Sequence, residues 1–343
     1  MSTLREPQGA SLRGPQGAPL VIGHRGASGY RPEHTRSAYE LAFTLGADAV
    51  EPDIVATKDG VLVLRHENEI SGTTDVASHP EFAKRRTTKT IDGVQLTGWF
   101  TEDFTWKELR TLRAIERLPQ FRQASATFDG REAILRLVDL MELIDDSSKR
   151  LGRPLVMVAE IKHPTYFESI GLPLDELFAV AVKEWATDAN LVIECFEQGV
   201  LAKIRARGVP GKLVFLVEAE GSPADLVALH GKKALSYAAH LTDAGFTRLA
   251  AAVDGVSFDK KMLLDGSTND LVERAHAAGL IVYTWTLRAE NRFLAKPFRR
   301  GPDKRDLGDW LGEFELILSS GVDGVFTDQP DLVRAALDVA PQP

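Results

Sequence analysis

Short apolar segments rich in β-branched residues recur along the whole chain, and most are followed by a stretch with helical periodicity. They cover residues 20–24, 48–55, 61–66, 155–161, 191–196, 212–217, 253–258, 281–286 and 322–327. In the stretch 35–45, Thr35 can cap a helix whose apolar residues share one face. Residues 268–278 and 330–338 show the same periodicity. Continuous apolar strands that alternate with helices predict a parallel sheet covered by helices.

These segments number one more than the eight strands that a (β/α)8 barrel needs. Only ATKDG separates residues 55 and 61, which is too short for a crossover between parallel strands. Because Asp-Gly is typical of a hairpin, residues 61–66 are expected to fold back antiparallel on 48–55. We therefore predict an α/β fold of the (β/α)8 TIM-barrel type. An open doubly wound sheet is the alternative, but the chain contains neither GxGxxG nor GxxxxGK[ST].

The connection from residue 67 to 154 is too long for an ordinary barrel loop and is expected to carry structure of its own. Thr105 and Glu108 form a capping-box pattern that opens a helix through residue 112. Residues 132–149 also have a helical pattern and are expected to lead into the next strand.

We expect three parts in the chain: a disordered leader at 1–18, a barrel domain at 19–340, and an insertion at 67–130 within that domain. The insertion follows the second barrel strand and its hairpin, so it should lie over one end of the barrel. We expect it to shape access to the site and selectivity for a substrate group rather than to take part in the chemistry.

Composition excludes several classes of protein. The formal net charge of −8 argues against a nucleic-acid partner. The single cysteine, Cys195, excludes a disulfide framework and a thiolate metal site. No segment has the uncharged apolar length of a membrane span, and the N-terminal residues lack the apolar core of a secretory signal. A cytoplasmic enzyme is expected, with a secreted form as the alternative if a signal segment precedes this sequence. Oligomeric state is not predicted.

Acidic residues stand at the carboxyl ends of two predicted strands, where barrel enzymes hold their catalytic groups. Glu51 and Asp53 are two residues apart on a strand and so share a face, and Glu160 and Lys162 repeat that spacing one strand along. Three converging carboxylates repel one another unless a cation lies between them. An all-oxygen site suits Mg²⁺ or Ca²⁺. The alternative is ordinary rim carboxylates that pair with Arg or Lys.

Two histidines are also directed towards this end of the barrel. His24 ends the first strand, and the hairpin places His66 opposite residue 52, beside the carboxylates. Imidazole titrates near neutrality, so one ring can act as a base and the other as an acid. His34 is a candidate for a supporting role behind them.

The remaining candidates concern substrate binding. Arg25, Lys162 and a divalent ion could together neutralise a phosphate, which suggests a phosphorylated small substrate. Phe196 and Trp285, at strand ends, could pack on an apolar or polyol face or could belong to the barrel core. Cys195 is expected to be a buried strand residue, because its neighbours are apolar.

Several motifs, in order, resemble the glycerophosphodiester phosphodiesterase family, and the histidine at position 34 resembles its larger bacterial branch. They are HRGASG at 24–29, PEHT at 32–35, EPD at 51–53, His66, EIK at 160–162 and GVDGVFTD at 321–328. The resemblance implies a (β/α)8 barrel with an inserted small domain. It also implies metal-dependent hydrolysis of small-molecule glycerophosphodiesters to glycerol 3-phosphate and an alcohol.

The resemblance also implies a role for individual positions: catalytic His24 and His66, metal-binding Glu51, Asp53 and Glu160, and phosphate-binding Arg25 and Lys162. Many members have His-Asp where this chain has His66-Glu67, so the resemblance assigns no role to Glu67.

Two other functions remain open. A phosphodiesterase of the same barrel type that acts on lysophospholipids would need an exposed apolar lip, for which the candidates are Trp99, Phe100, Phe104 and Trp106. A non-catalytic barrel that binds phosphate or a partner would be expected to lack one of the histidines or carboxylates.

Overall fold

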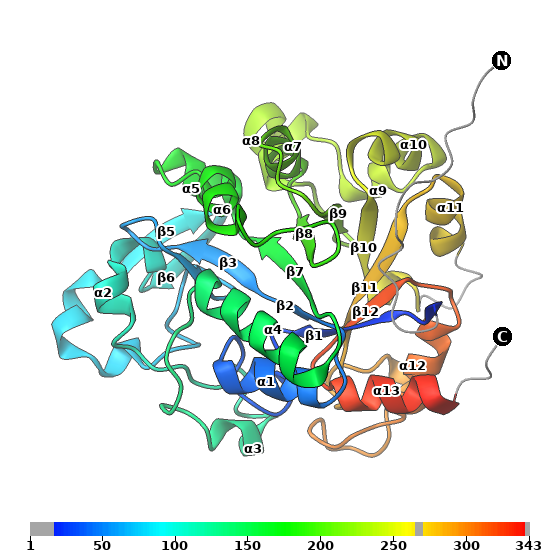
Figure 1. Ribbon diagram of the computed structural model, residues 1–343, viewed down its shortest axis with the longest axis horizontal. Helices are drawn as coiled ribbons and strands as arrows, with labels where there is room; N and C mark the ends of the chain where they lie inside the picture. Colours follow the sequence, from blue (N-terminus) through cyan, green and yellow to red (C-terminus); the bar gives the residue numbers. More distant parts are fainter. Residues whose placement is uncertain (1–16, 265–269, 340–343) are drawn as a thin grey trace.

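The first and last strands of the sheet lie side by side in the computed structural model, which describes residues 17–264 and 270–339, and they close the sheet into a barrel (Figure 1). Leu20 of β1 is opposite Gly324 of β12. The barrel positions, in order, are β1 (Leu20–His24), β2 (Ala49–Glu51) with β3 (Asp53–Ala56), β7 (Val156–Ile161), β8 (Leu191–Cys195), β9 (Lys212–Val217), β10 (Gly255–Asp259), β11 (Ile281–Leu287) and β12 (Gly324–Thr327). All neighbouring positions pair in parallel, which confirms the predicted (β/α)8 barrel.

The second barrel position differs from its prediction, because 48–55 forms two short strands instead of one. Pro52 lies between β2 and β3 and has no backbone N–H to donate to a sheet. The hairpin is confirmed: β4 (Leu62–Leu64) runs antiparallel to β3, with Ile54 opposite Leu64.

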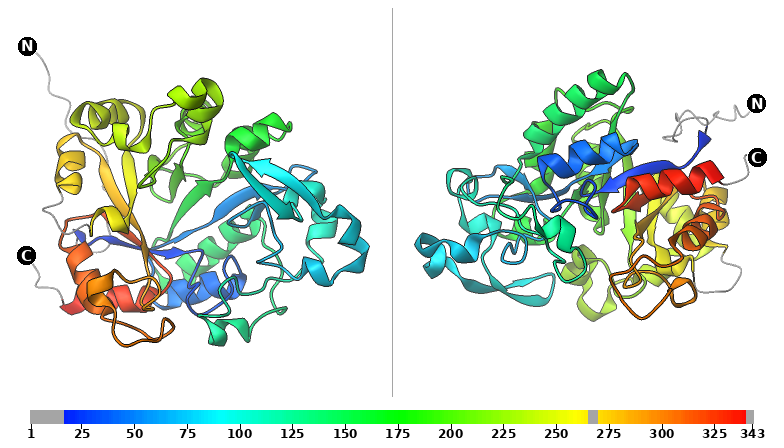
Figure 2. Two further views of the ribbon diagram at one scale, coloured as in Figure 1. Left: turned by 180° about the vertical axis from the view of Figure 1, so that it is seen from behind. Right: turned by 90° about the horizontal axis from the view of Figure 1, so that it is seen from below.

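Helices cover the outside of the barrel, and α1, α4 and α13 lie together on one face when the molecule is seen from below (Figure 2). Thr35 Oγ1 accepts a hydrogen bond from the backbone N–H of Ala38 and caps the first helix as predicted. The helices are α1 (Arg36–Thr44), α4 (Leu137–Leu151), α5 (Pro164–Ser169), α6 (Leu174–Val182), α7 (Gln198–Ala206), α8 (Ala224–His230), α9 (Tyr237–His240), α10 (Asp243–Ala252), α11 (Leu271–Ala277), α12 (Trp310–Leu318) and α13 (Pro330–Val339).

One predicted helix has a different start, and another cannot be compared at its start. The helix predicted at 132–149 begins only at Leu137, because the chain before it continues the sheet edge: the N–H of Leu64 donates to the carbonyl of Leu135. The start of the predicted helix 268–278 lies outside the described residues, as does most of the predicted leader.

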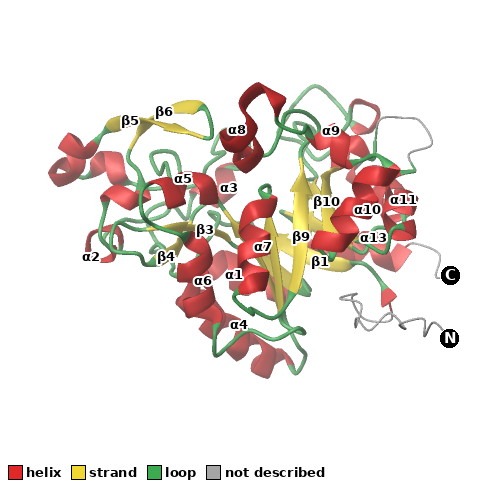
Figure 3. Ribbon diagram, turned by 90° about the horizontal axis from the view of Figure 1, so that it is seen from above, coloured by secondary structure: helices red, strands yellow, loops and turns green. Residues whose placement is uncertain are grey.

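The insertion carries a two-stranded hairpin, β5 (Thr87–Ile91) and β6 (Val94–Gly98), and two short helices, α2 (Trp106–Leu109) and α3 (Gln123–Ala126). The hairpin lies on the same side of the molecule as α8, over the carboxyl ends of the strands (Figure 3). The predicted capping box of Thr105 and Glu108 is present. No helix in the described parts of the chain is long and apolar enough to span a membrane.

The barrel interior determines where the polar side chains lie. Residues at every second position fill it, including Leu20 and Ile22 of β1 and Val156 and Val158 of β7. The same two-residue period continues towards the carboxyl ends of the strands, where the next inward positions are polar. These polar positions are His24 on β1, Glu51 on β2, Glu160 on β7 and Glu194 on β8, whereas the corresponding position on β11 is the aromatic Trp285.

Candidate active site

Three carboxylates converge at the mouth of the barrel. Glu51, Asp53 and Glu160 each offer an oxygen, and these atoms all lie within 4.8 Å of one another. All three side chains are buried, and Glu51 Oε1 and Asp53 Oδ1 have no hydrogen-bond partner. Buried carboxylate oxygens without partners are costly to keep, so a hard cation bound by oxygen fits this donor set. The predicted carboxylates are therefore brought together.

The three carboxyl groups are buried close together, so their pKa values are shifted from the ordinary ones. Burial and the nearby Asp53 raise the pKa of Glu51 well above its ordinary value. Burial also raises the pKa of Glu160, to about 7, although Lys162 opposes it. Burial acts against ionisation of Asp53 too, but Arg25 and Lys162 outweigh it and lower the pKa of that carboxyl well below its usual range. The cluster thus needs positive charge to be fully ionised.

Two cations provide part of that charge. Arg25 Nε lies 2.9 Å from Asp53 Oδ2, and Lys162 Nζ lies 2.8 Å from Glu160 Oε1. Arg25 also donates to Glu33 Oε2 at 3.1 Å, and Arg117 of the insertion reaches the same oxygen at 2.8 Å. Both Arg25 and Lys162 line the cavity at the barrel mouth, as expected of phosphate-binding groups.

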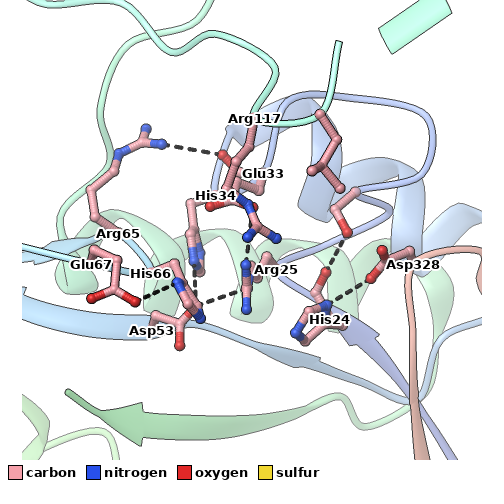
Figure 4. A network of polar contacts seen from close by, with 12 residues as sticks. His24, Arg25, Glu33, His34, Asp53, Arg65, His66, Glu67, Arg117 and Asp328 are labelled. Carbon is pink, nitrogen blue, oxygen red and sulfur yellow. Dashed lines mark hydrogen bonds and ion pairs between the residues drawn. The ribbon is translucent and has the colours of Figure 1, made fainter. Parts of the chain in front are cut away.

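His24 is fixed by a carboxylate from the other end of the chain. Its Nδ1 lies 2.6 Å from Asp328 Oδ1 (Figure 4). The carboxylate is itself held by Arg122 Nη2 at 2.5 Å and Arg288 Nε at 2.6 Å. Nδ1 is engaged, so Nε2 is the ring nitrogen left for proton transfer. Burial and Arg25 lower the pKa of His24 to about 3, against the opposing effect of Asp328.

His66 lies on the other side of Arg25 and is partly buried (Figure 4). Its Nδ1 is 2.9 Å from Glu67 Oε1. Burial, Arg25 and Lys162 lower the pKa of His66 to about 4. Each candidate histidine therefore has a carboxylate on Nδ1 and is neutral at physiological pH.

His34 supports the cluster from behind, as expected. It is fully buried, with Nε2 2.9 Å from Asp53 Oδ2 and Nδ1 2.7 Å from the hydroxyl of Tyr39. The two contacts fix the ring, which in turn holds the Asp53 carboxylate.

The cavity over these groups has a volume of about 1320 Å³ and extends beneath the β5–β6 hairpin. Phe196 and Trp285 line it, with ring centroids 5.8 Å apart in an edge-to-face arrangement, so both form a wall of the site. Cys195 is buried and its thiol contacts the carbonyl of Ile161, in agreement with a packing role.

The structure brings to the site three groups that were not among the predicted site residues. Asp328 lies in the GVDGVFTD motif, but only the closure of the barrel brings it to His24. Glu194 is buried, lies in register with Glu160 on the neighbouring strand, and has an unpartnered Oε2. Its inward position on β8 was available from strand periodicity. No local pattern indicated Arg122, which the insertion supplies.

A family model described as the glycerophosphoryl diester phosphodiesterase family matches residues 24–332, a range that contains every group described above. The chain belongs to this family. Among curated relatives, the glycerophosphodiester phosphodiesterase GDPD6 of Arabidopsis thaliana is 32% identical over 90% of this chain and 83% of that protein. The glycerophosphodiester phosphodiesterase of Bacillus subtilis is 26% identical over 91% of this chain and 84% of its own.

Solved structures share the fold of this family member. A family protein from Silicibacter pomeroyi superimposes with a TM-score of 0.66 at 22% identity, covering 96% of both chains. A phosphodiesterase of Oleispira antarctica, solved in complex with the product sn-glycerol-3-phosphate, gives a TM-score of 0.60 at 20% identity, covering 94% of this chain and 97% of its own. The chain is therefore a glycerophosphodiester phosphodiesterase-family hydrolase on a TIM barrel.

The four residues named as candidates for an apolar lip do not form one. Trp99, Phe100 and Phe104 are buried and Trp106 is packed against the core, so these residues form no exposed apolar lip. Both histidines and all three carboxylates are present and assembled, whereas a non-catalytic barrel was expected to lack one of them.

Proposed function

We propose that this chain hydrolyses glycerophosphodiesters to sn-glycerol 3-phosphate and an alcohol, using a divalent cation and two histidines. One observation carries the proposal: two imidazoles, each oriented by a carboxylate, face a cluster of three buried carboxylates flanked by Arg25 and Lys162. This combination suits the hydrolysis of a phosphodiester. The cations neutralise the anionic phosphate, and the imidazoles take a proton from the attacking hydroxyl and give one to the leaving alkoxide.

The divalent cation, Mg²⁺ or Ca²⁺, would be held by Glu51, Asp53 and Glu160. When bound, it supplies positive charge that polarises a phosphoryl oxygen. Glu51 Oε1 and Asp53 Oδ1, which accept no hydrogen bond, support this assignment, because hard cations prefer carboxylate oxygens as ligands.

Arg25 and Lys162 would bind the non-bridging oxygens of the phosphate and stabilise the charge that develops on them. Arg25 is held by Asp53 and Glu33, so its guanidinium is oriented before substrate arrives. Preorganised donors of this kind stabilise a transition state without reorganisation during the reaction.

Proton transfer would use the Nε2 atoms of His24 and His66. One neutral imidazole accepts the proton of the attacking hydroxyl as the new P–O bond forms. The other takes up a proton from solvent when the anionic substrate binds beside it and raises its pKa, and it donates this proton to the leaving alkoxide as the old P–O bond breaks. The proton accepted by the first imidazole returns to solvent after product release. The attacking hydroxyl belongs either to water or to the neighbouring glycerol carbon, and the latter route passes through a cyclic phosphate that water then opens.

Recognition would come from the glycerol side. Its hydroxyls can bond to carboxylates of the cluster while its carbons pack on Phe196 and Trp285. A site built to bond hydroxyls strongly rejects analogues that lack them, whereas the wide cavity tolerates different alcohols.

The test compares kcat/KM for glycerophosphocholine, glycerophosphoethanolamine and bis(p-nitrophenyl) phosphate. We expect the first two to lie within about tenfold of each other, as in a tolerant pocket. The third has a better leaving group but no glycerol, and we expect it to be the poorest substrate. If it were hydrolysed as efficiently as the glycerol diesters, the chain would be a general phosphodiesterase and glycerol recognition would be refuted.

A further inference from the structure

The tip of the inserted hairpin contacts a residue that follows the β7 strand of the site. Asp92 and Gly93 form the two-residue turn between β5 and β6, and both have positive φ, as such turns require. Asp92 Oδ2 lies 2.5 Å from Nδ1 of His163, which is one residue beyond Lys162. The turn therefore brings an acidic side chain of the insertion onto the end of a barrel strand.

His163 is linked through Glu67 to His66, the candidate catalytic histidine. Its second nitrogen, Nε2, lies 2.9 Å from Glu67 Oε2, and the other oxygen of that carboxylate lies 2.9 Å from Nδ1 of His66. Carboxylates and imidazoles thus alternate along one continuous path, Asp92–His163–Glu67–His66. Each contact is short enough to be a charge-assisted hydrogen bond when His163 donates from both nitrogens.

The geometry of this path indicates an orienting role. A free Glu67 side chain could adopt several rotamers, but a donor on one oxygen fixes where the other oxygen lies. That second oxygen holds Nδ1 of His66 and so directs Nε2 away from Glu67. A carboxylate on one ring nitrogen selects the tautomer and the ring orientation of a histidine.

Backbone conformation distinguishes the same residues. Four non-glycine residues in the described chain have a positive φ: Arg25, His34, Asp92 and His163. The first two belong to the site, and the other two are the members of the path that join the hairpin to it. Backbone held in this region costs free energy and persists only where surrounding contacts enforce it.

We propose that the inserted hairpin is a positioning element of the active site, in which Asp92 acts through His163 and Glu67 to fix the ring of His66. This departs from the expectation that the insertion only shapes access. The inference rests on the proposed function in one respect, namely that His66 transfers a proton in the reaction.

The kinetic test uses Asp92→Ala and Asp92→Asn, with Lys89→Met as a matched control. Lys89 lies in the same hairpin and pairs with Glu102 and Asp103, away from the path. For Asp92→Ala we expect kcat on glycerophosphocholine to fall about tenfold, the lower end of the effect of losing an orienting partner, with KM within about twofold. Asp92→Asn keeps an acceptor for His163 and should recover part of kcat, whereas Lys89→Met should keep the parent kcat.

A second measurement does not depend on turnover. In metal-free protein with ¹⁵N-labelled histidine, the ring nitrogens of His66 report which of them carries the proton. We expect a single Nδ1–H form in the parent protein and in Lys89→Met, and shifts averaged towards a mixture of tautomers in Asp92→Ala. Unchanged His66 signals together with an unchanged kcat in Asp92→Ala would overturn the proposal. If Asp92→Ala does not fold, the same two readings on Asp92→Gly decide, because glycine removes the carboxylate and accepts the positive φ at this position.

The outcomes separate this inference from the proposed function. If the parent protein did not cleave any glycerophosphodiester, the proposed function would fail while the nitrogen signals still decided the role of Asp92. If the parent turned over normally and Asp92→Ala matched it in both measurements, only the positioning role would be refuted.

Discussion

Lys162 Nζ lies 2.8 Å from Glu160 Oε1, two residues back along β7, and 3.7 Å from Asp53 Oδ1. One ammonium group thus offsets part of the repulsion between two of the three clustered carboxylates. Burial lowers the pKa of Lys162, but these two carboxylates outweigh it and raise the pKa above its ordinary value, so the side chain stays charged. A cation in this place faces both the acidic cluster and the cavity where a phosphate would bind.

Replacing Lys162 with methionine keeps the length of the side chain and removes its charge. We expect KM for glycerophosphocholine to rise about tenfold or more, in line with the loss of a hydrogen bond between charged groups. Lys203→Met is the matched control, because Lys203 pairs with exposed Glu168 on the outside of the barrel. Equal KM values for the two variants would exclude Lys162 from phosphate binding.

Removal of the divalent cation should abolish turnover, and added Mg²⁺ or Ca²⁺ should restore it. We expect Glu51→Gln to weaken metal binding about tenfold or more. Loss of a residue that only supports a metal ligand already lowers metal affinity by about 10- to 100-fold. Titration calorimetry on EDTA-treated protein measures this directly. Glu116→Gln, which alters a buried carboxyl bonded to Ser125 in the insertion, is the control. Full activity in a metal-free preparation would contradict a metal site.

His24→Ala and His66→Ala should each lower kcat by about 10²- to 10⁴-fold, the usual loss for a general acid or base. The two rings serve the same displacement, so the double variant should lose much less than the product of the two single losses. Steady-state kinetics of the three variants measure this. Losses that multiply would mean that the two histidines act independently.

Asp328→Asn tests the carboxylate behind His24. An amide can present a donor to Nδ1 and so favour the wrong tautomer, and we expect kcat to fall by about 10²-fold or more. Asp331→Asn is the control, because Asp331 follows the same strand but accepts a hydrogen bond from Tyr30. The thermal midpoint is measured alongside, since Asp328 also pairs with buried Arg122. If Asp328→Asn had the same kcat as Asp331→Asn, Asp328 would not be needed to orient His24.

Stability should depend on pH through His163. Burial lowers the pKa of this imidazole, but hydrogen bonds to Asp92 and Glu67 outweigh burial and raise the pKa to about 9, against 6.5 for an ordinary histidine. The folded protein therefore holds this proton more tightly than the unfolded chain does. The stabilisation is fully present below pH 6.5 and is lost as pH rises from 6.5 through 9.

Urea unfolding between pH 7.5 and 9.5 measures this dependence, because His24 and His66, with lowered pKa values, contribute the opposite change only below about pH 7. We expect the free energy of unfolding to fall across that window, and we expect His163→Gln to flatten the profile. His230→Gln replaces an exposed histidine and should leave the profile unchanged. A free energy of unfolding that rises with pH in the parent protein would contradict the proposed charge on His163.

Much of the fold follows from local sequence. Buried parallel strands must be apolar throughout, so the barrel strands are visible as apolar runs, and Asp59-Gly60 marks the hairpin. Strand ends are less well defined, because hydrogen bonding rather than composition sets them. Pro52, between Glu51 and Asp53, divides the predicted strand 48–55 into β2 and β3, and the late start of α4 at Leu137 depends on a contact with β4.

Some residues of the candidate site could likewise be predicted from sequence, and others could not. Glu51, Asp53 and Glu160 could be predicted because inward positions at strand ends follow a two-residue period. Contacts such as that of Arg122 with Asp328 join residues far apart in the chain, and only packing of the insertion against the barrel brings them together. Such side chains carry no periodic signal, so their partners could not be inferred from sequence.

The pairing of β1 with β12 has a consequence for protein synthesis. His24 is translated 304 residues before Asp328, its partner at 2.6 Å. The nascent chain therefore lacks the carboxylate that orients His24 until β12 and the residue after it have been made. A product terminated before β12 would contain both histidines and all three clustered carboxylates but would lack the strand that pairs with β1 and β11, so we expect it to be inactive.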